Sequence, residues 1–193
     1  MSTTRAYACI ALTPQEVERW PDTPVANVLA AGWLRSRSTT LHLPAVDRAV
    51  PVCRYLTRLW LDQQHLTDEG VRHTTLLITT ELATNAILHT NSSIITTDLQ
   101  QNRGHLRIQM RDQGTERTVK HWHSNSGFGR GLGIVANCTR ALGTHVERDG
   151  SRTIWATISL TVSGASSCEV AVGCQVSRCP LKTVLGPRRW CPR

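Results

Sequence analysis

The chain has 193 residues, of which 40% are hydrophobic and 19% are charged, a composition typical of a soluble globular protein with one domain and room for flanking tails. No apolar run approaches the ~18 residues that a membrane span needs, and the first ten residues lack the apolar stretch of a secretory signal. We therefore expect a cytoplasmic protein without a membrane partner. The net charge of +8 points to nucleic acid, but half of it, +4, lies in residues 162–193, so this class of partner ranks last.

Composition divides the chain into three segments. Residues 1–40 mix Thr, Pro, Ser, Ala and Arg without periodicity, so we expect a mobile leader apart from one short helix that residues 14–20 can form. Residues 41–161 carry the periodic patterns of a folded domain. In residues 162–193 Ser, Gly, Cys, Pro and Arg replace those patterns, which predicts a disordered basic tail. The seven cysteines include no Cys-x-x-Cys pair and are expected to be reduced thiols.

The first half of the domain reads as a strand, two helices and a hairpin. A short alternating strand at 41–43 precedes a helix at 47–61 and a second, longer helix at 67–90, for which Thr67 or Asp68 is the expected cap. β-rich strands then follow at 93–100 and 105–111, with a turn at 101–104 between them.

The second half begins with a polar loop that leads to a glycine-rich run. A helix is predicted at 132–142, with Gly143 as its C′ residue. A final hairpin is predicted from strands at 144–148 and 152–160 around an Asp149-Gly150 turn. This order of elements predicts an α/β fold, a two-layer α+β sandwich with a mixed, mostly antiparallel sheet and helices on one face.

Two polar residues interrupt the apolar stripe of the second helix. At about 100° per residue, Glu81 and Asn85 lie about 40° apart on one face, among Leu77, Ile78 and Leu82. A carboxylate and an amide in such a stripe need partners. They either pair with other buried groups or line a cavity and meet a ligand.

The glycines from Gly127 to Gly133 alternate with other residues before the third helix. A backbone without side chains can approach phosphates closely, and the following helix N-terminus offers free N–H groups. Arg130 adds a permanent positive charge. A Rossmann fingerprint needs a strand directly before the glycines, and a P-loop needs Gly-Lys-Ser/Thr, so neither pattern applies here.

Three features occur in a fixed order: Glu-x-x-x-Asn on a helix, Asp-x-Gly after a strand, and a glycine-rich loop that enters a helix. This combination resembles the Bergerat-type ATP-binding domain of the GHKL group, which includes gyrase and the histidine kinases. The segments Glu81-Leu-Ala-Thr-Asn-Ala-Ile-Leu-His89 and Gly129-Arg-Gly-Leu-Gly-Ile-Val135 are most similar to the anti-sigma-factor serine/threonine kinase branch. The resemblance covers roughly residues 41–160.

The resemblance implies a role for each matching residue. Glu81 matches the general base, and Asn85 the magnesium ligand that bridges the metal to the phosphates of ATP. Asp112 matches the carboxylate that accepts a hydrogen bond from the adenine amino group, and Gly114 keeps the backbone close beneath the base. The remaining matches are the phosphate loop, Gly129, Arg130, Gly131, Leu132 and Gly133, and a strand threonine near the adenine, Thr153. Taken alone, Asp112 and Gly114 also fit a strand-ending turn, and Thr153 an ordinary β residue.

The chain departs from the wider superfamily after Gly114, where the Asp-x-Gly box continues with Thr115 and Glu116 and does not reach the second glycine common in that superfamily. The loop from Gly114 to Gly127 is short, so no large ATP lid is expected. The resemblance implies a protein that binds Mg²⁺ and ATP, transfers the γ-phosphate to a serine or threonine of an antagonist, and also sequesters a sigma factor. A non-catalytic ATP-dependent switch, a nucleic-acid-binding protein that uses the basic tail, and assembly as a homodimer stay open.

Overall fold

The computed structural model describes residues 8–21, 36–114 and 130–160. Its elements follow along the chain as β1 (Ala8–Ala11), α1 (Pro14–Glu18), β2 (Ser38–Pro44), α3 (Ala49–Gln63), α4 (Glu69–His89), β3 (Ile94–Asn102), β4 (His105–Asp112), α5 (Arg130–Cys138), β5 (Ala141–Val146) and β6 (Arg152–Ser159). The predicted tail at 162–193 lies outside the described residues. Among the described helices, none combines the length and apolar character that crossing a bilayer requires.

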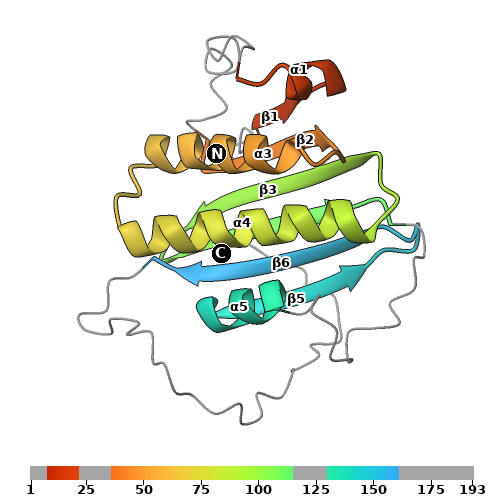
Figure 1. Ribbon diagram of the computed structural model, residues 1–193. Helices are drawn as coiled ribbons and strands as arrows, with labels where there is room; N and C mark the ends of the chain where they lie inside the picture. The colour runs from red at the N-terminus through yellow and green to blue at the C-terminus, as the bar shows by residue number, and fades with distance from the viewer. Residues whose placement is uncertain (1–7, 22–35, 115–129, 161–193) are drawn as a thin grey trace, which may run out of the picture. The chain divides into compact units, whose positions relative to one another are not determined.

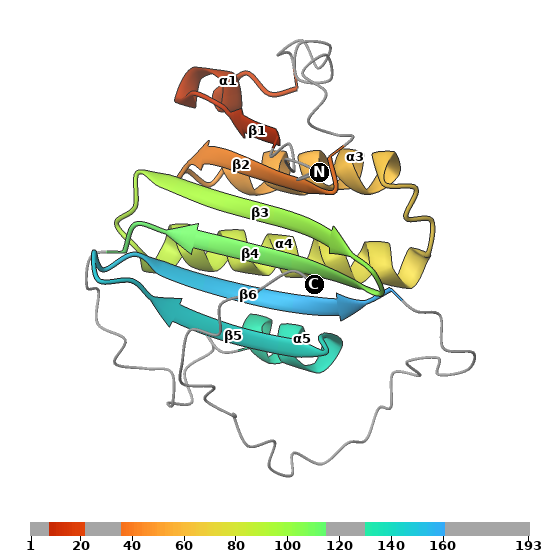
Figure 2. The same cartoon turned by 180° about the vertical axis from the view of Figure 1, so that it is seen from behind.

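The strands form one six-stranded sheet in the order β1-β2-β3-β4-β6-β5. β1 runs parallel to β2, whereas the other neighbouring strands pair antiparallel. Helices α3, α4 and α5 lie together on one face (Figure 1), and the opposite view shows the strands in front of these helices (Figure 2). The predicted two-layer sandwich with a mixed, mostly antiparallel sheet is therefore confirmed.

The core lies between the sheet and the three helices. Alternate residues of the central strands point into it, because successive side chains of a strand face opposite sides of the sheet. Leu99 of β3 and Ile108 of β4 are fully buried, as are Leu56 and Trp60 of α3 and Ile78 of α4. This burial fixes which face of each strand is left for solvent or for partners.

Helix α4 is the element that positions the predicted site. It begins after Asp68, whose side-chain oxygen accepts a hydrogen bond from the Val71 N–H at 2.8 Å, and it runs for 21 residues. An N-cap carboxylate satisfies one of the free N–H groups at a helix start. Asp68 is thus the cap, one of the two residues that the sequence offered for this position.

The N-terminal part of the chain contains more ordered structure than the mobile leader that the sequence predicts. The short helix is present as α1, capped by Thr13, but residues 8–11 also pair with β2 as an edge strand. Ile10, Val17 and Trp20 belong to the hydrophobic core. A four-residue strand is too short to show a period in the sequence, and its pairing with β2 stabilises it instead.

The prediction of a helix through residue 142 with Gly143 at its C′ position is wrong. Helix α5 ends at Cys138, and Gly143 lies inside β5 opposite Trp155. A Cβ atom at Gly143 would overlap the indole ring of Trp155. Glycine therefore serves here to make room for a neighbouring side chain on the sheet, a requirement that depends on strand pairing and not on local sequence.

Candidate functional site

Glu81 and Asn85 lie on the flank of α4 that faces α5. The helix turns Ile78, Leu82 and Ala86 into the core, where all three are buried. Glu81 and Asn85 are half-buried, and neither side chain forms a hydrogen bond or ion pair with another described residue. Their side-chain oxygens therefore remain free, within the described part of the chain, to meet a ligand.

Gly131, in the first turn of α5, packs directly against the Glu81 carboxylate. A Cβ atom built at Gly131 would overlap Glu81 Oε2 and would lie 2.9 Å from Glu81 Cδ. Only a glycine allows this approach without moving the acid. The carboxylate thus stands at the start of a helix, where free N–H groups and the helix dipole favour negative charge.

Asp112 closes β4 and is buried on the helix-covered side of the sheet, with a relative exposure of 3%. Its Oδ2 accepts a hydrogen bond from Arg152 Nε at 3.2 Å, and its Oδ1 accepts one from the Gly114 N–H at 3.0 Å. Burial raises the pKa of the Asp112 carboxyl above its ordinary value, and Arg152 and the Gly114 N–H offset part of that rise because they stabilise the carboxylate.

The ends of α4 and β4 are tied together. The Gln113 N–H donates to Ser92 Oγ at 2.8 Å, and the Ser93 N–H donates to Gln113 Oε1 at 3.1 Å. Both elements accordingly end on the same side of the molecule (Figure 1). The carboxylate of Asp112 therefore lies at the end of the domain toward which α4 carries Asn85.

Gly114 allows a close backbone approach, but the neighbour is part of the protein itself. A Cβ atom there would lie 2.8 Å from Asp112 Oδ1 and 3.0 Å from the carbonyl oxygen of Gly150. Gly150 belongs to the turn between β5 and β6 and has a φ of 82°, which favours glycine. The absence of a side chain at Gly114 lets the end of β4 meet this turn.

Thr153 does not share a face of the sheet with Asp112. Asp112 pairs with Arg152, and Arg111 pairs with Thr153. Since directly paired residues point to the same side, the pleat places Asp112 and Arg152 toward the helices and Thr153 on the opposite face. The structure therefore does not bring Thr153 together with the other predicted site residues.

The rest of the predicted phosphate loop is described only in part. Leu132 is half-buried against the core, whereas a Cβ atom at Gly133 would meet nothing within 4 Å. Arg130 begins α5, but its side chain and the whole of Gly129 lie outside what the structure describes. Of this loop, the structure brings Gly131 into contact with Glu81.

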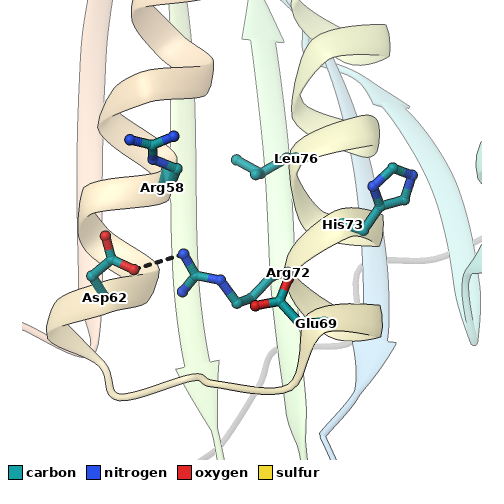
Figure 3. A pocket seen from close by; sticks show the side chains of 6 residues that line it. All are labelled: Arg58, Asp62, Glu69, Arg72, His73 and Leu76. Atoms are coloured by element: carbon teal, nitrogen blue, oxygen red, sulfur yellow. Dashed lines mark ion pairs between the residues drawn. The ribbon is translucent and has the colours of Figure 1, made fainter.

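A hollow of about 420 Å³ lies elsewhere, between α3 and the first half of α4 (Figure 3). Leu76 points from α4 toward α3, and Arg72 reaches across to Asp62 at 2.6 Å. Its lining includes two arginines and two acids, Asp62 and Glu69, and Arg72 is already ion-paired with Asp62. None of the predicted site residues lines it.

The residue that the sequence analysis missed is Arg152. Its guanidinium forms the described ion pair with the buried Asp112 carboxylate, and its side chain is only 18% exposed. A basic residue two positions after Gly150 is a weak signal in the sequence. The antiparallel register of β4 and β6 joins two residues that are 40 positions apart in the chain.

The described residues contain no group of three or more His, Cys, Asp or Glu side chains that could hold a metal ion by themselves. Comparison with known proteins adds no assignment, because no family model matches the chain and no curated protein matches it significantly.

Proposed function

We propose that this chain binds Mg·ATP between α4, α5 and the end of β4, and that it transfers the γ-phosphate to a serine or threonine of a protein partner. The phosphoryl acceptor is an antagonist of an anti-sigma factor, and the chain also sequesters a sigma factor. The observation that carries the proposal is the contact between Glu81 and Gly131, which joins two motifs separated by 50 positions. Asn85, on the same flank of α4, and Asp112, at the end of β4, extend the set.

The donor chemistry of these residues fits a nucleotide. A carboxylate offers about four lone-pair sites, and Asp112 uses one for Arg152 and one for the Gly114 N–H. It can therefore still accept a hydrogen bond from an adenine amino group. Asn85 supplies one neutral oxygen, which suits Mg²⁺ because this ion takes most of its ligands from water and phosphates.

Glu81 is the residue that would act on a proton. With a hydroxyl nucleophile within hydrogen-bond reach, the Glu81 carboxylate would accept its proton while the hydroxyl oxygen bonds to the γ-phosphorus, and the bond from that phosphorus to the bridging oxygen would break to release ADP. Bound Mg·ATP would supply the phosphoryl group and the metal charge. The contribution of the protein would be mainly positioning and electrostatic stabilisation.

A non-catalytic switch is the second candidate, and the same contact favours it. In this case the Glu81 carboxylate would serve only to hold α5 through its contact with Gly131. Such a protein would bind ATP and change a partner surface without phosphoryl transfer. Formation of a phosphorylated partner, or release of phosphate, separates the two candidates.

Titration of Mg·ATP into wild type, Asp112→Ala and Asp149→Ala tests nucleotide binding. Asp149 is the matched control, since it carries the same charge in an exposed turn of the same sheet. We expect binding by wild type and Asp149→Ala and at least a tenfold loss in Asp112→Ala, with circular dichroism to verify folding. No binding by wild type at millimolar Mg·ATP would remove the nucleotide proposal.

Glu81→Gln tests the catalytic role once binding is established. We expect nucleotide affinity within about threefold of wild type and loss of phosphoryl transfer to a partner captured with ATP and Mg²⁺. Transfer at the wild-type rate in Glu81→Gln would refute the general-base role.

A further inference from the structure

One face of the sheet is covered by none of the described helices, and we call it the helix-free face. It carries a row of residues that the proposed nucleotide site does not use. In register across six strands, this row consists of Cys9, Thr40, Asp98, Gln109, Trp155 and Gly143. Because paired residues of neighbouring strands point to the same side, these positions all lie opposite the face that α3, α4 and α5 cover (Figure 2).

Hydrogen bonds connect the middle of the row. Asp98 Oδ1 accepts from Thr40 Oγ1 at 2.6 Å, and Asp98 Oδ2 accepts from Gln109 Nε2 at 3.2 Å. Gln109 Oε1 in turn accepts from the Arg107 guanidinium at 3.3 Å. Neutral donors thus occupy both oxygens of the Asp98 carboxylate, and the chain of hydrogen bonds ends on an arginine.

Arg107 is held in place by Trp155. Its guanidinium carbon lies 4.3 Å from the centre of a Trp155 ring, and that indole in turn lies over β5 at Gly143, where a Cβ atom would overlap it. Stacking on an aromatic face restricts the guanidinium while leaving its N–H groups at the rim free to donate. The arginine is therefore ordered before any partner binds.

In the described part of the chain, no acid is bonded to the Arg107 guanidinium. Within the described residues no carboxylate forms an ion pair with Arg107, although Arg111 on the same face pairs with Asp149 at 3.3 Å. Partial burial lowers the pKa of Arg107, and the nearby Asp98 charge opposes that change. A guanidinium has five N–H donors, and the described contacts use one.

A hollow of about 240 Å³ adjoins this arginine. Its six lining residues are all polar or charged and come from three neighbouring strands: Ser38, Thr40, Asp98, Gln100, Arg107 and Gln109. Asp98 and Arg107 carry its two opposite charges, and both oxygens of Asp98 already accept hydrogen bonds from Thr40 and Gln109. Buried arginine and tryptophan side chains supply much of the binding energy at protein interfaces, and an arginine favours planar acceptors such as carboxylates.

We propose that the helix-free face is a docking surface for an acidic segment of a partner protein, with a carboxylate of that segment bound to Arg107 beside this hollow. The charge and the free donors of Arg107 select the acid, and the Trp155 stack orients the guanidinium for it. This surface is opposite the nucleotide site, so the proposal stands whether or not the chain binds ATP.

Selection of a random heptapeptide phage library on the folded full-length chain tests the proposal. We expect enriched peptides to contain Asp or Glu above the frequency of the library. Titration of the synthetic peptides at 150 mM salt should then show at least a fivefold loss of affinity in Arg107→Gln and less than a twofold loss in Arg111→Gln. Arg111 is the matched control because it has the same charge on the same face.

Arg107→Lys distinguishes the stacked guanidinium from positive charge alone, and we expect it to restore less than half of the lost binding free energy. The proposal is overturned if no peptide is enriched, if enriched peptides lack acids, or if Arg107→Gln and Arg111→Gln weaken binding equally. It is also overturned if the wild-type chain binds a dT15 oligonucleotide, or associates with a second copy of itself, and Arg107→Gln abolishes that binding or that self-association.

Discussion

Replacing Gly131 with alanine tests the contact between α4 and α5 on which the candidate site depends. The new Cβ atom would overlap the Glu81 carboxylate. Since a carboxylate is the far end of a flexible side chain, we expect Glu81 to turn away while α5 keeps its place. The substitution is therefore expected to separate the two motifs without unfolding the domain.

Two effects of opposite sign set the magnitude. Alanine in place of glycine stabilises a helix by up to about 1 kcal/mol. Displacing the carboxylate from the N-terminal end of α5 costs about 0.3–1 kcal/mol. Gly131→Ala should therefore stabilise Glu81→Ala by more than it stabilises wild type, with a coupling of about 0.5 kcal/mol. Gly133→Ala, where the Cβ atom meets nothing within 4 Å, should act equally in both backgrounds.

Urea unfolding of wild type, the three single variants and the two double variants measures this coupling. Gly133→Ala reports the helix preference alone, because it lies in the same helix but contacts nothing. An identical effect of Gly131→Ala with and without Glu81 would show that the acid does not pack against α5 in solution. The proposed nucleotide site would then lose the contact that defines it.

Three further predictions concern the charges and thiols. Arg152→Ala leaves the buried Asp112 without its cation, and in urea unfolding it should lower the free energy of unfolding by about 3 kcal/mol. Arg111→Ala is the control because it breaks an exposed ion pair, and it should lower the free energy of unfolding by less than about 1 kcal/mol. Burial raises the pKa of Asp112 in the folded state, so the folded state binds more protons than the unfolded state above the ordinary pKa of 3.8. Wild type should therefore lose stability relative to Asp112→Asn as the pH rises from about 4 through the raised pKa. A stability difference between the two proteins that does not change with pH would contradict this. Burial raises the pKa of the Cys53 thiol to about 11. At pH 8, iodoacetamide should therefore label the exposed Cys9 and leave Cys53 unmodified, as measured by peptide mapping. Labelling of both thiols at the same rate would contradict the burial of Cys53.

Local sequence was sufficient for the parts of the fold that depend on short-range physics. The Asp68 cap, the alternation of buried residues in β3 and β4, and the turns at Gly104 and Gly150 were all predictable. Both glycines adopt positive φ angles, of 78° and 82°, which explains why the two hairpins turn there. The pairing of Glu81 and Asn85 on one flank likewise follows from helical geometry alone.

Pairing between distant segments determined the rest. Gly143 lies in a strand and not at a helix end, because β5 pairs with β6 and sets Gly143 opposite Trp155. Ile10 lies in the core because β1 pairs with β2. The register of β4 with β6 decided that Arg152 meets Asp112 and that Thr153 faces the other way. A change of one position in that register would exchange the two faces of the strand, and residues 40 apart carry no local signal that fixes it. Local sequence by itself therefore determined the candidate residues, and the tertiary structure decided which of them meet.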